Sequence, residues 1–117
     1  MSRNRWHILR ERDRYTLARH VPARFDVEAT AHFPPARMDR LAQQIRQDLW
    51  RELKHLRGFS PVVSIAAQSK GLTVRAGGRV AGGHIPHATG HIIQALLADP
   101  ARRSRWMRWA RASQEPS

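Results

Sequence analysis

The chain of 117 residues carries 21 Lys and Arg against 9 Asp and Glu, a formal net charge of +12 at pH 7, and it contains no cysteine. This length predicts one domain over residues 1–117. The absence of cysteine excludes disulfide scaffolds and thiolate sites for zinc, iron–sulfur clusters or nucleophilic catalysis. No apolar run approaches the ~20 residues of a membrane span, and the N-terminal residues lack the apolar core of a signal peptide. We therefore expect a cytoplasmic protein without a transmembrane segment.

Arginine dominates the basic residues, since the only lysines are Lys54 and Lys70. So large a positive charge attracts polyanions: nucleic acid first, then an anionic membrane surface or an acidic protein partner. The planar guanidinium group suits phosphate binding and stacking on bases. A GC-rich genome would also favour arginine codons at solvated positions. That explanation accounts for the preference for arginine over lysine but not for the excess of positive charge.

The first 24 residues allow two interpretations. In the first, alternating apolar residues form the inward faces of two strands joined by a turn at residues 11–14: Trp6, Ile8, Tyr15 and Leu17. In the second, Trp6, Leu9 and Leu17 lie on a frayed helix. The extended interpretation is favoured. Residues 1–14 and 113–117 are expected to be flexible.

The clearest patterns follow in the next segment. Residues 25–33 alternate strictly between apolar and polar side chains, which predicts a strand with one buried face, and Pro34 and Pro35 end it. Over residues 35–57, apolar side chains recur at spacings of three and four, which predicts a long amphipathic helix followed by Gly58 at its C′ position. The predicted buried stripe of this helix consists of Met38, Leu41, Ala42, Ile45, Leu49, Leu53 and Leu56.

Residues 62–68 and 72–76 predict two strands joined by a turn at Lys70 and Gly71, which makes an antiparallel hairpin. The glycine-rich stretch 75–83 predicts a basic loop, and residues 86–99 predict a helix. Pro100 either breaks that helix or starts a final one that runs to about residue 112. The expected fold class is α+β, in the order β-α-β-β-α-α. A small, mostly antiparallel sheet would pack on one long amphipathic helix, with the C-terminal helices alongside.

The densest run of arginines lies in residues 102–111. On a helix, Trp106, Trp109 and Ala110 share one face and the arginines spread over the other, which suits phosphate contacts with tryptophan stacking on bases. Such a helix also suits anionic lipid, or it closes the core with both tryptophans buried and its arginines solvated. Together with two arginines of the glycine-rich stretch, the candidate nucleic-acid-binding residues are Arg75, Arg79, Arg102, Arg103, Arg105, Arg108 and Arg111.

Two further features of the sequence are candidate ligand sites. Glycine pairs at 77–78 and 82–83 flank Arg79 and would let backbone N–H groups approach a phosphate. Their spacing matches neither the Walker nor the dinucleotide pattern, so a connecting loop is the favoured interpretation. The spacing of His84, His87 and His91 would suit zinc or nickel, but no nearby carboxylate supports such a site. We expect no metal and no cofactor, although metal binding by these histidines stays open.

The acidic residues give little support to catalysis. Asp26 and Glu28 share one face of the predicted strand, where they could bind Mg²⁺ or act as acid and base. Ion pairs with arginines on a neighbouring strand are the favoured role. No serine lies in a nucleophile-elbow pattern, and no spacing selects a catalytic histidine. An enzyme is therefore the less favoured class.

Two functions remain. The favoured one is a small basic, non-enzymatic protein that binds DNA or RNA through contacts to the phosphate backbone. The alternative is a protein–protein interaction or assembly module, either an accessory subunit or a homo-oligomer. In that alternative an acidic partner meets the arginines, and Trp6, Trp106 or Trp109 anchors a hydrophobic interface. Arginines that converge on a concave face would favour nucleic acid, whereas an exposed tryptophan among apolar neighbours would favour a protein partner.

Overall fold

The computed structural model describes residues 6–82 and 84–112. Five of its elements are strands: β1 (His7–Arg10), β2 (Arg14–Ala18), β3 (Val27–Phe33), β4 (Phe59–Gln68) and β5 (Gly71–Val80). Three are helices: α1 (Met38–Leu53), α2 (Thr89–Ala98) and α3 (Pro100–Ala112). The strands form one sheet in the order β1-β2-β4-β5-β3, and each neighbouring pair is antiparallel. The predicted α+β class and antiparallel sheet are confirmed.

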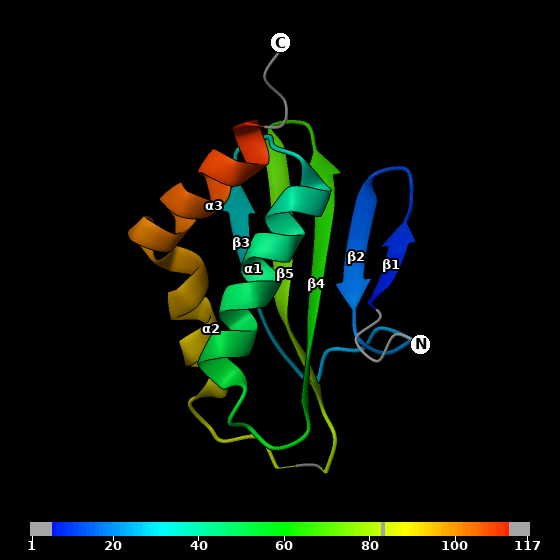
Figure 1. Ribbon diagram of the computed structural model, residues 1–117, viewed down its shortest axis with the longest axis vertical. Coiled ribbons are helices and arrows are strands. Elements are labelled where there is room, and N and C mark those ends of the chain that lie inside the picture. The colour runs from blue at the N-terminus through cyan, green and yellow to red at the C-terminus, as the bar shows by residue number, and fades with distance from the viewer. Residues whose placement is uncertain (1–5, 83, 113–117) are drawn as a thin grey trace.

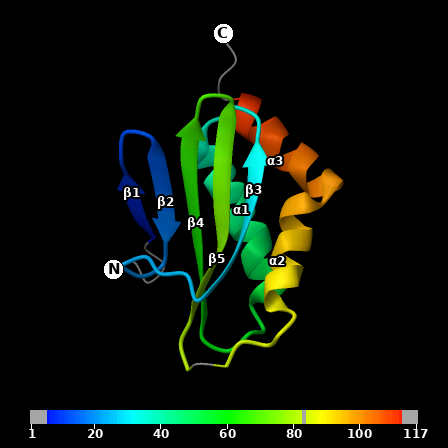
Figure 2. The ribbon, with the colours of Figure 1, turned by 180° about the vertical axis from the view of Figure 1, so that it is seen from behind.

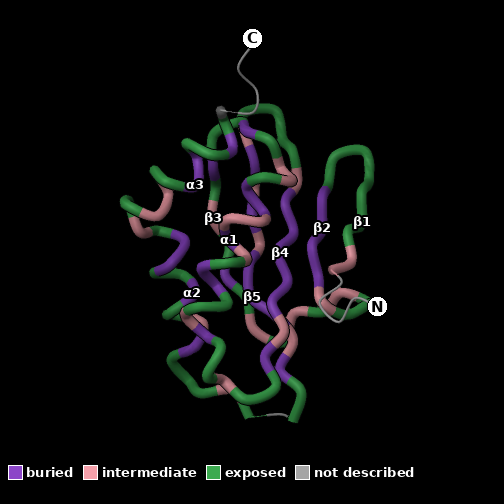
Figure 3. Tube along the Cα trace, viewed as in Figure 1, coloured by how far each residue is buried: buried purple, intermediate pink, exposed green. Residues whose placement is uncertain are grey.

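The helices form a second layer on one face of the sheet (Figures 1 and 2). α1 lies across β4 and β5. Its apolar residues recur with the period of a helix and so form one stripe, which packs against the apolar side of both strands. Buried residues line β2, β4, β5 and the inward sides of the helices (Figure 3). The largest fully buried side chains include Trp106, Leu17, Ile45 and Leu49. Among the described residues, no helix is long and apolar enough to cross a membrane.

The opposite face of the sheet carries the alternate side chains of each strand. In β5, Leu72, Val74 and Ala76 are buried under the helices, so Thr73 and Arg75 project from the other side. The connection between β2 and β3 crosses this open face near the end of β5 (Figure 2). It places the ring of Phe25 4.5 Å from the guanidinium carbon of Arg75.

The predicted element order is corrected at its beginning and its middle. The N-terminal segment forms the hairpin β1–β2, as in the extended interpretation, so two strands precede the predicted order. Tyr15 and Leu17 are buried as expected, but Ile8 is exposed, so its predicted inward position is wrong. The long helix spans only Met38–Leu53 and not residues 35–57. Its C-terminal end tightens into turns, in which the backbone N–H of Leu56 bonds to the carbonyl oxygen of Leu53 at 2.9 Å. The helix expected at residues 86–99 begins later, at Thr89, after a turn closed by the carbonyl oxygen of Pro86.

The predicted glycine-rich loop is wrong over most of its length, because β5 continues to Val80. Gly77 pairs with Glu28 on one side and with Val62 on the other, and Gly78 is buried in the same way between two strands. A Cβ atom on Gly77 would collide with the carbonyl oxygen of Val27. The glycines therefore allow three strands to approach closely.

Candidate anion-binding groove

The seven arginines predicted to hold nucleic acid lie on two sides of the molecule. Arg75 and Arg79 belong to β5 and project from the open face of the sheet, because the residues between and beside them are buried under the helices. The remaining five belong to α3, in the helical layer. The structure thus brings the α3 arginines together along one helix and separates them from the two on β5.

Four of the seven arginines form hydrogen bonds or ion pairs with other residues of the protein. Arg75 donates two hydrogen bonds to the carboxylate of Glu28, at 2.7 and 2.9 Å. The hydrogen bonds from Arg75 lower the pKa of Glu28, and the same bonds raise the pKa of Arg75. The others are on α3: Arg102 pairs with Glu52 and Asp99, Arg103 with the carbonyl oxygens of Leu97 and His32, and Arg105 with Asp48. These contacts hold the helical layer together.

Arg108 and Arg111 line a hollow of about 390 Å³ at the end of α3. Arg103, Ser104 and Met107 lie beside them on α3, and Pro34 closes the other side. Neither Arg108 nor Arg111 is paired with a carboxylate among the residues that the structure describes. This hollow is the part of the predicted α3 surface that is open to an external anion.

The two tryptophans of α3 separate in their environments. Trp106 is fully buried, and its indole Nε1 donates a hydrogen bond to Asp48 at 2.7 Å. Trp109 has 52% of its surface exposed. The interpretation in which both tryptophans close the core is therefore wrong for Trp109, whose side chain lies outside the buried stripe formed by Trp106, Met107 and Ala110.

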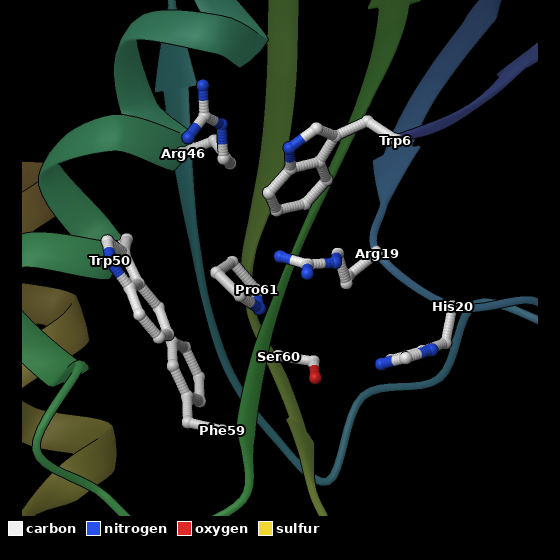
Figure 4. Close-up of a pocket in the computed structure, with 8 residues that line it drawn as sticks. All are labelled: Trp6, Arg19, His20, Arg46, Trp50, Phe59, Ser60 and Pro61. Carbon is white, nitrogen blue, oxygen red and sulfur yellow. The ribbon is translucent and has the colours of Figure 1, made fainter. Parts of the chain in front are cut away.

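A larger hollow of about 510 Å³ lies between α1, the end of β2 and the start of β4 (Figure 4). It is lined by Trp6, Arg19, His20, Arg46, Trp50, Phe59, Ser60 and Pro61. A smaller hollow of about 250 Å³ shares His20 and Ser60 with it and adds Gly58, Arg79 and Ala81. We call the two together the basic groove. Its lining includes Arg46 on α1, in the helical layer, and Arg79, one of the arginines predicted from the sequence, which projects from the open face of the sheet.

Cationic side chains in the groove surround a tryptophan. The guanidinium carbon of Arg46 lies 4.8 Å from the centre of the Trp6 ring, and that of Arg19 lies 5.7 Å from it. The contact with Trp6 holds the guanidinium group of Arg46 in place without neutralising it. None of the described residues that line the groove is an aspartate or glutamate.

Arg46 is the most confined of these cations. Its Nε is buried and has no hydrogen-bond partner among the described atoms, while its Nη2 donates to the Gln43 side chain at 3.0 Å. Burial lowers the pKa of Arg46, and the charge of Arg51 lowers it further. Arginine nevertheless stays protonated in proteins. The groove therefore contains a desolvated positive charge that no described carboxylate balances, a condition that a bound anion relieves.

Most residues of this site were not predicted from the sequence. Arg46 and Trp50 are one helical turn apart on α1, outside its apolar stripe. The sequence signal of this site is a tryptophan on the polar side of the predicted long helix, one turn from an arginine. Trp6 and Arg19 reach the groove only because β2 pairs with β4 beside α1, and no local pattern predicts that packing.

The described residues contain no group of three His, Asp or Glu side chains placed to hold a metal ion. His84, His87 and His91 are exposed, and only His91 belongs to α2. Cross-strand ion pairs with arginines were expected for both Asp26 and Glu28. Glu28 pairs with Arg75 on β5 as expected, whereas the ion pair of Asp26 is with Arg24, two residues before it in the chain. Neither family models, curated proteins nor solved structures gave a match to this chain.

Proposed function

We propose that this protein binds the phosphate backbone of nucleic acid and that the basic groove is the main contact surface. The observation that carries the proposal is the groove's composition: Arg19, His20, Arg46 and Arg79 line it, and no carboxylate does among the described residues. Polyanions bind where basic groups converge on a hollow surface. The expected DNA or RNA ligand and the cytoplasmic location both stay predictions from the sequence.

The distribution of acidic residues supports this proposal. Most described carboxylates already form ion pairs with arginines elsewhere: Glu11, Asp26, Glu28, Asp39, Asp48, Glu52 and Asp99. Within the described ranges, Arg46 and Arg79 take part in none of these pairs. The pKa of Asp26 is lowered mainly by hydrogen bonds from Arg24 and the Val80 N–H, and the charge of Arg79 lowers it further. The surplus positive charge is thus available at the groove to an external anion.

A protein interface is the second candidate, and the exposure of Trp109 is the observation that favours it. Trp109 has half of its surface in solvent, and Arg108 and Arg111 on the same helix line a hollow. Exposed tryptophan and arginine are typical anchors of protein interfaces. An acidic protein partner or a second copy of the chain would bind at α3 in this alternative.

The test is a fluorescence-anisotropy titration of labelled DNA and RNA oligonucleotides over a salt series. We expect binding at ~0.15 M salt with a linear fall of log affinity against log salt. Arg46→Glu and Arg79→Glu should each weaken binding at least tenfold. Lys70→Glu is the charge-matched control, because Lys70 lies in the turn between β4 and β5, at the opposite end of that hairpin from Ser60.

Three outcomes decide the matter. Loss of affinity in the Arg46 and Arg79 variants, with little change for Lys70→Glu, supports the groove. A loss for Arg108→Glu that exceeds both would move the contact surface to α3. If the native protein does not bind either nucleic acid at ~0.15 M salt, the charge acts only as a nonspecific field, and the nucleic-acid proposal is wrong.

A further inference from the structure

The larger hollow of the basic groove has two facing walls. Arg46 and Trp50 reach into it from α1, while Trp6 and Arg19 reach into it from the side of β1 and β2 (Figure 4). Pro61 lies at its base. The volume of about 510 Å³ falls in the range of roughly 300–1,000 Å³ that is typical of small-ligand pockets. Its size and its lining of aromatic and cationic side chains suit one compact ligand with both planar and anionic parts.

Trp50 offers a flat apolar surface to such a group. Its ring is nearly parallel to that of Phe59, with an interplanar angle of 10° and a centroid separation of 6.4 Å. The side chain nevertheless keeps 42% of its surface exposed, an unusual state for tryptophan. Phe59 is buried beside it and fixes the orientation of the indole. A planar ligand that packed on Trp50 would extend this aromatic stack.

Arg46 supplies the anion contact one helical turn away on the same helix. Trp6 packs against its guanidinium group and Gln43 accepts one of its hydrogen bonds, so the group is held in place before any ligand arrives. Its buried Nε has no partner among the described atoms. Trp6 is thus a positioning residue for Arg46, whereas Trp50 is open to direct contact. The aromatic surface of Trp50 and the confined cation of Arg46 are four residues apart on α1, a rise of about 6 Å along its axis.

We propose that this pocket holds one unpaired nucleobase against Trp50, with a phosphate of the same strand on Arg46. The inference rests on the nucleic-acid binding proposed above and adds a preference for single strands. In a duplex each base is paired and stacked, so its face is closed to Trp50, whereas a single strand exposes it. Stacking on an aromatic side chain tolerates any base, so the pocket favours single strands without strong sequence preference.

The experiment compares three oligonucleotides of equal length: a single strand, a duplex, and a single strand whose bases are replaced by abasic sites. The abasic strand keeps its phosphates and loses its bases. We expect the native protein to bind the single strand about 5- to 150-fold more tightly than the abasic strand, the range expected for one stacked base. Trp50→Ala should abolish this difference, and Trp50→Phe should restore part of it. Parallel DNA and RNA strands show whether the sugar matters.

Trp109→Ala is the matched control, because Trp109 is also an exposed tryptophan on a helix but lies outside the groove. It should keep the full discrimination against the abasic strand. Trp50→Ala should keep the native circular-dichroism spectrum, because its side chain is only partly buried. Equal binding of the single strand and the abasic strand by the native protein would overturn the base pocket and leave the proposed backbone binding intact. Failure to bind any of the three oligonucleotides would overturn both.

Discussion

The buried carboxylate of Asp48 accepts a hydrogen bond of 2.7 Å from the indole Nε1 of Trp106, which joins the middle of α1 to α3. Arg51 donates to the other carboxylate oxygen at 3.1 Å, and Arg105 donates to the same oxygen as Trp106. Charge-assisted bonds of this kind compensate the cost of burying a carboxylate. The ring of Phe33 lies 6.2 Å from that of Trp106 and connects this cluster to the sheet. Asp48 therefore fixes α3 in the helical layer.

The first prediction concerns this bond. Asp48→Ala leaves the buried Trp106 N–H without an acceptor, which costs about 1–3 kcal/mol of the free energy of unfolding. Urea denaturation followed by circular dichroism measures the loss. Glu52→Ala is the control, because the Glu52 ion pair with Arg102 is partly exposed, and an exposed pair contributes about 0–1 kcal/mol. Equal losses in the two variants would show that the Trp106 bond contributes nothing specific.

The second prediction contrasts two glycines. A Cβ on Gly77 would collide with the backbone of Val27, whereas a Cβ on Gly90 would meet no atom within 4 Å. Gly77→Ala should therefore destabilise the protein by about 1–3 kcal/mol or more, since the neighbouring backbone must move. Gly90→Ala should stabilise it by roughly 0.5–1 kcal/mol, because alanine favours the helix. Midpoints of thermal or urea unfolding check both changes.

The opposite result is informative in each case. If Gly77→Ala retained native stability, the close approach of β3 and β5 at that residue would be wrong. If Gly90→Ala were destabilising, Gly90 would not lie in a regular and open turn of α2, as it does here. Because the two variants differ only in position, any effect of the added methyl group on the unfolded chain is similar in both.

The third prediction is a dependence of stability on acid. Hydrogen bonds from Arg24 and from the Val80 backbone N–H hold the pKa of Asp26 below its ordinary value of 3.8. The folded state therefore binds this proton less readily than the unfolded state. The resulting stabilisation is fully present above the unfolded pKa and is lost as the pH falls through the folded pKa. Asp26→Asn removes this contribution, so its stability should fall less steeply from pH 5 towards pH 2.

Urea unfolding at several pH values measures both curves. The two proteins should differ most above pH 5 and approach each other in strong acid, where Asp26 is protonated in both states. Parallel curves would show that Asp26 has the same pKa in the folded and unfolded chain, contrary to its contacts with Arg24 and Val80.

Local periodicity predicted the core of the fold but not its limits. The apolar stripe of α1 is visible because spacings of three and four place Leu41, Ile45 and Leu49 on one side of a helix, and these residues are buried. The run around Gly77 and Gly78 was expected to be a loop, because glycine has low strand propensity. Both glycines form part of β5 since strands pair with it on both sides. That condition depends on neighbours distant in the sequence.

The candidate site was predictable only in its charge. Arginines were expected to bind an anion, and Arg79 does line the groove. An ion pair of Glu28 with an arginine of a neighbouring strand was predicted, but the spacing did not identify that arginine as Arg75. It also gave no sign that Arg105 binds Asp48, because these pairs join residues 47 and 57 positions apart. The contact between Trp6 and Arg46 likewise depends on how the β1–β2 hairpin packs beside α1. Which arginines remain open is decided by tertiary structure.

The fourth prediction distinguishes Arg75 from Arg79, two arginines of β5 that were both predicted from the sequence to bind nucleic acid. Arg79 lines the groove and pairs with no carboxylate among the described residues. The guanidinium group of Arg75 is occupied by Glu28 and lies over the ring of Phe25. Arg79→Ala should therefore reduce the slope of log affinity against log salt by about one unit, as expected for one lost phosphate contact.

The matched control is the double variant Glu28→Gln/Arg75→Gln, which removes the ion pair and keeps the net charge. Its salt slope should equal that of the native protein, because neither group contacts the nucleic acid. The same oligonucleotide and salt series serve both variants. A slope reduced by about one unit in the double variant would mean that Arg75 leaves Glu28 to bind a phosphate. The contact surface would then extend from the basic groove across the open face of the sheet, as the set of arginines predicted from the sequence implies.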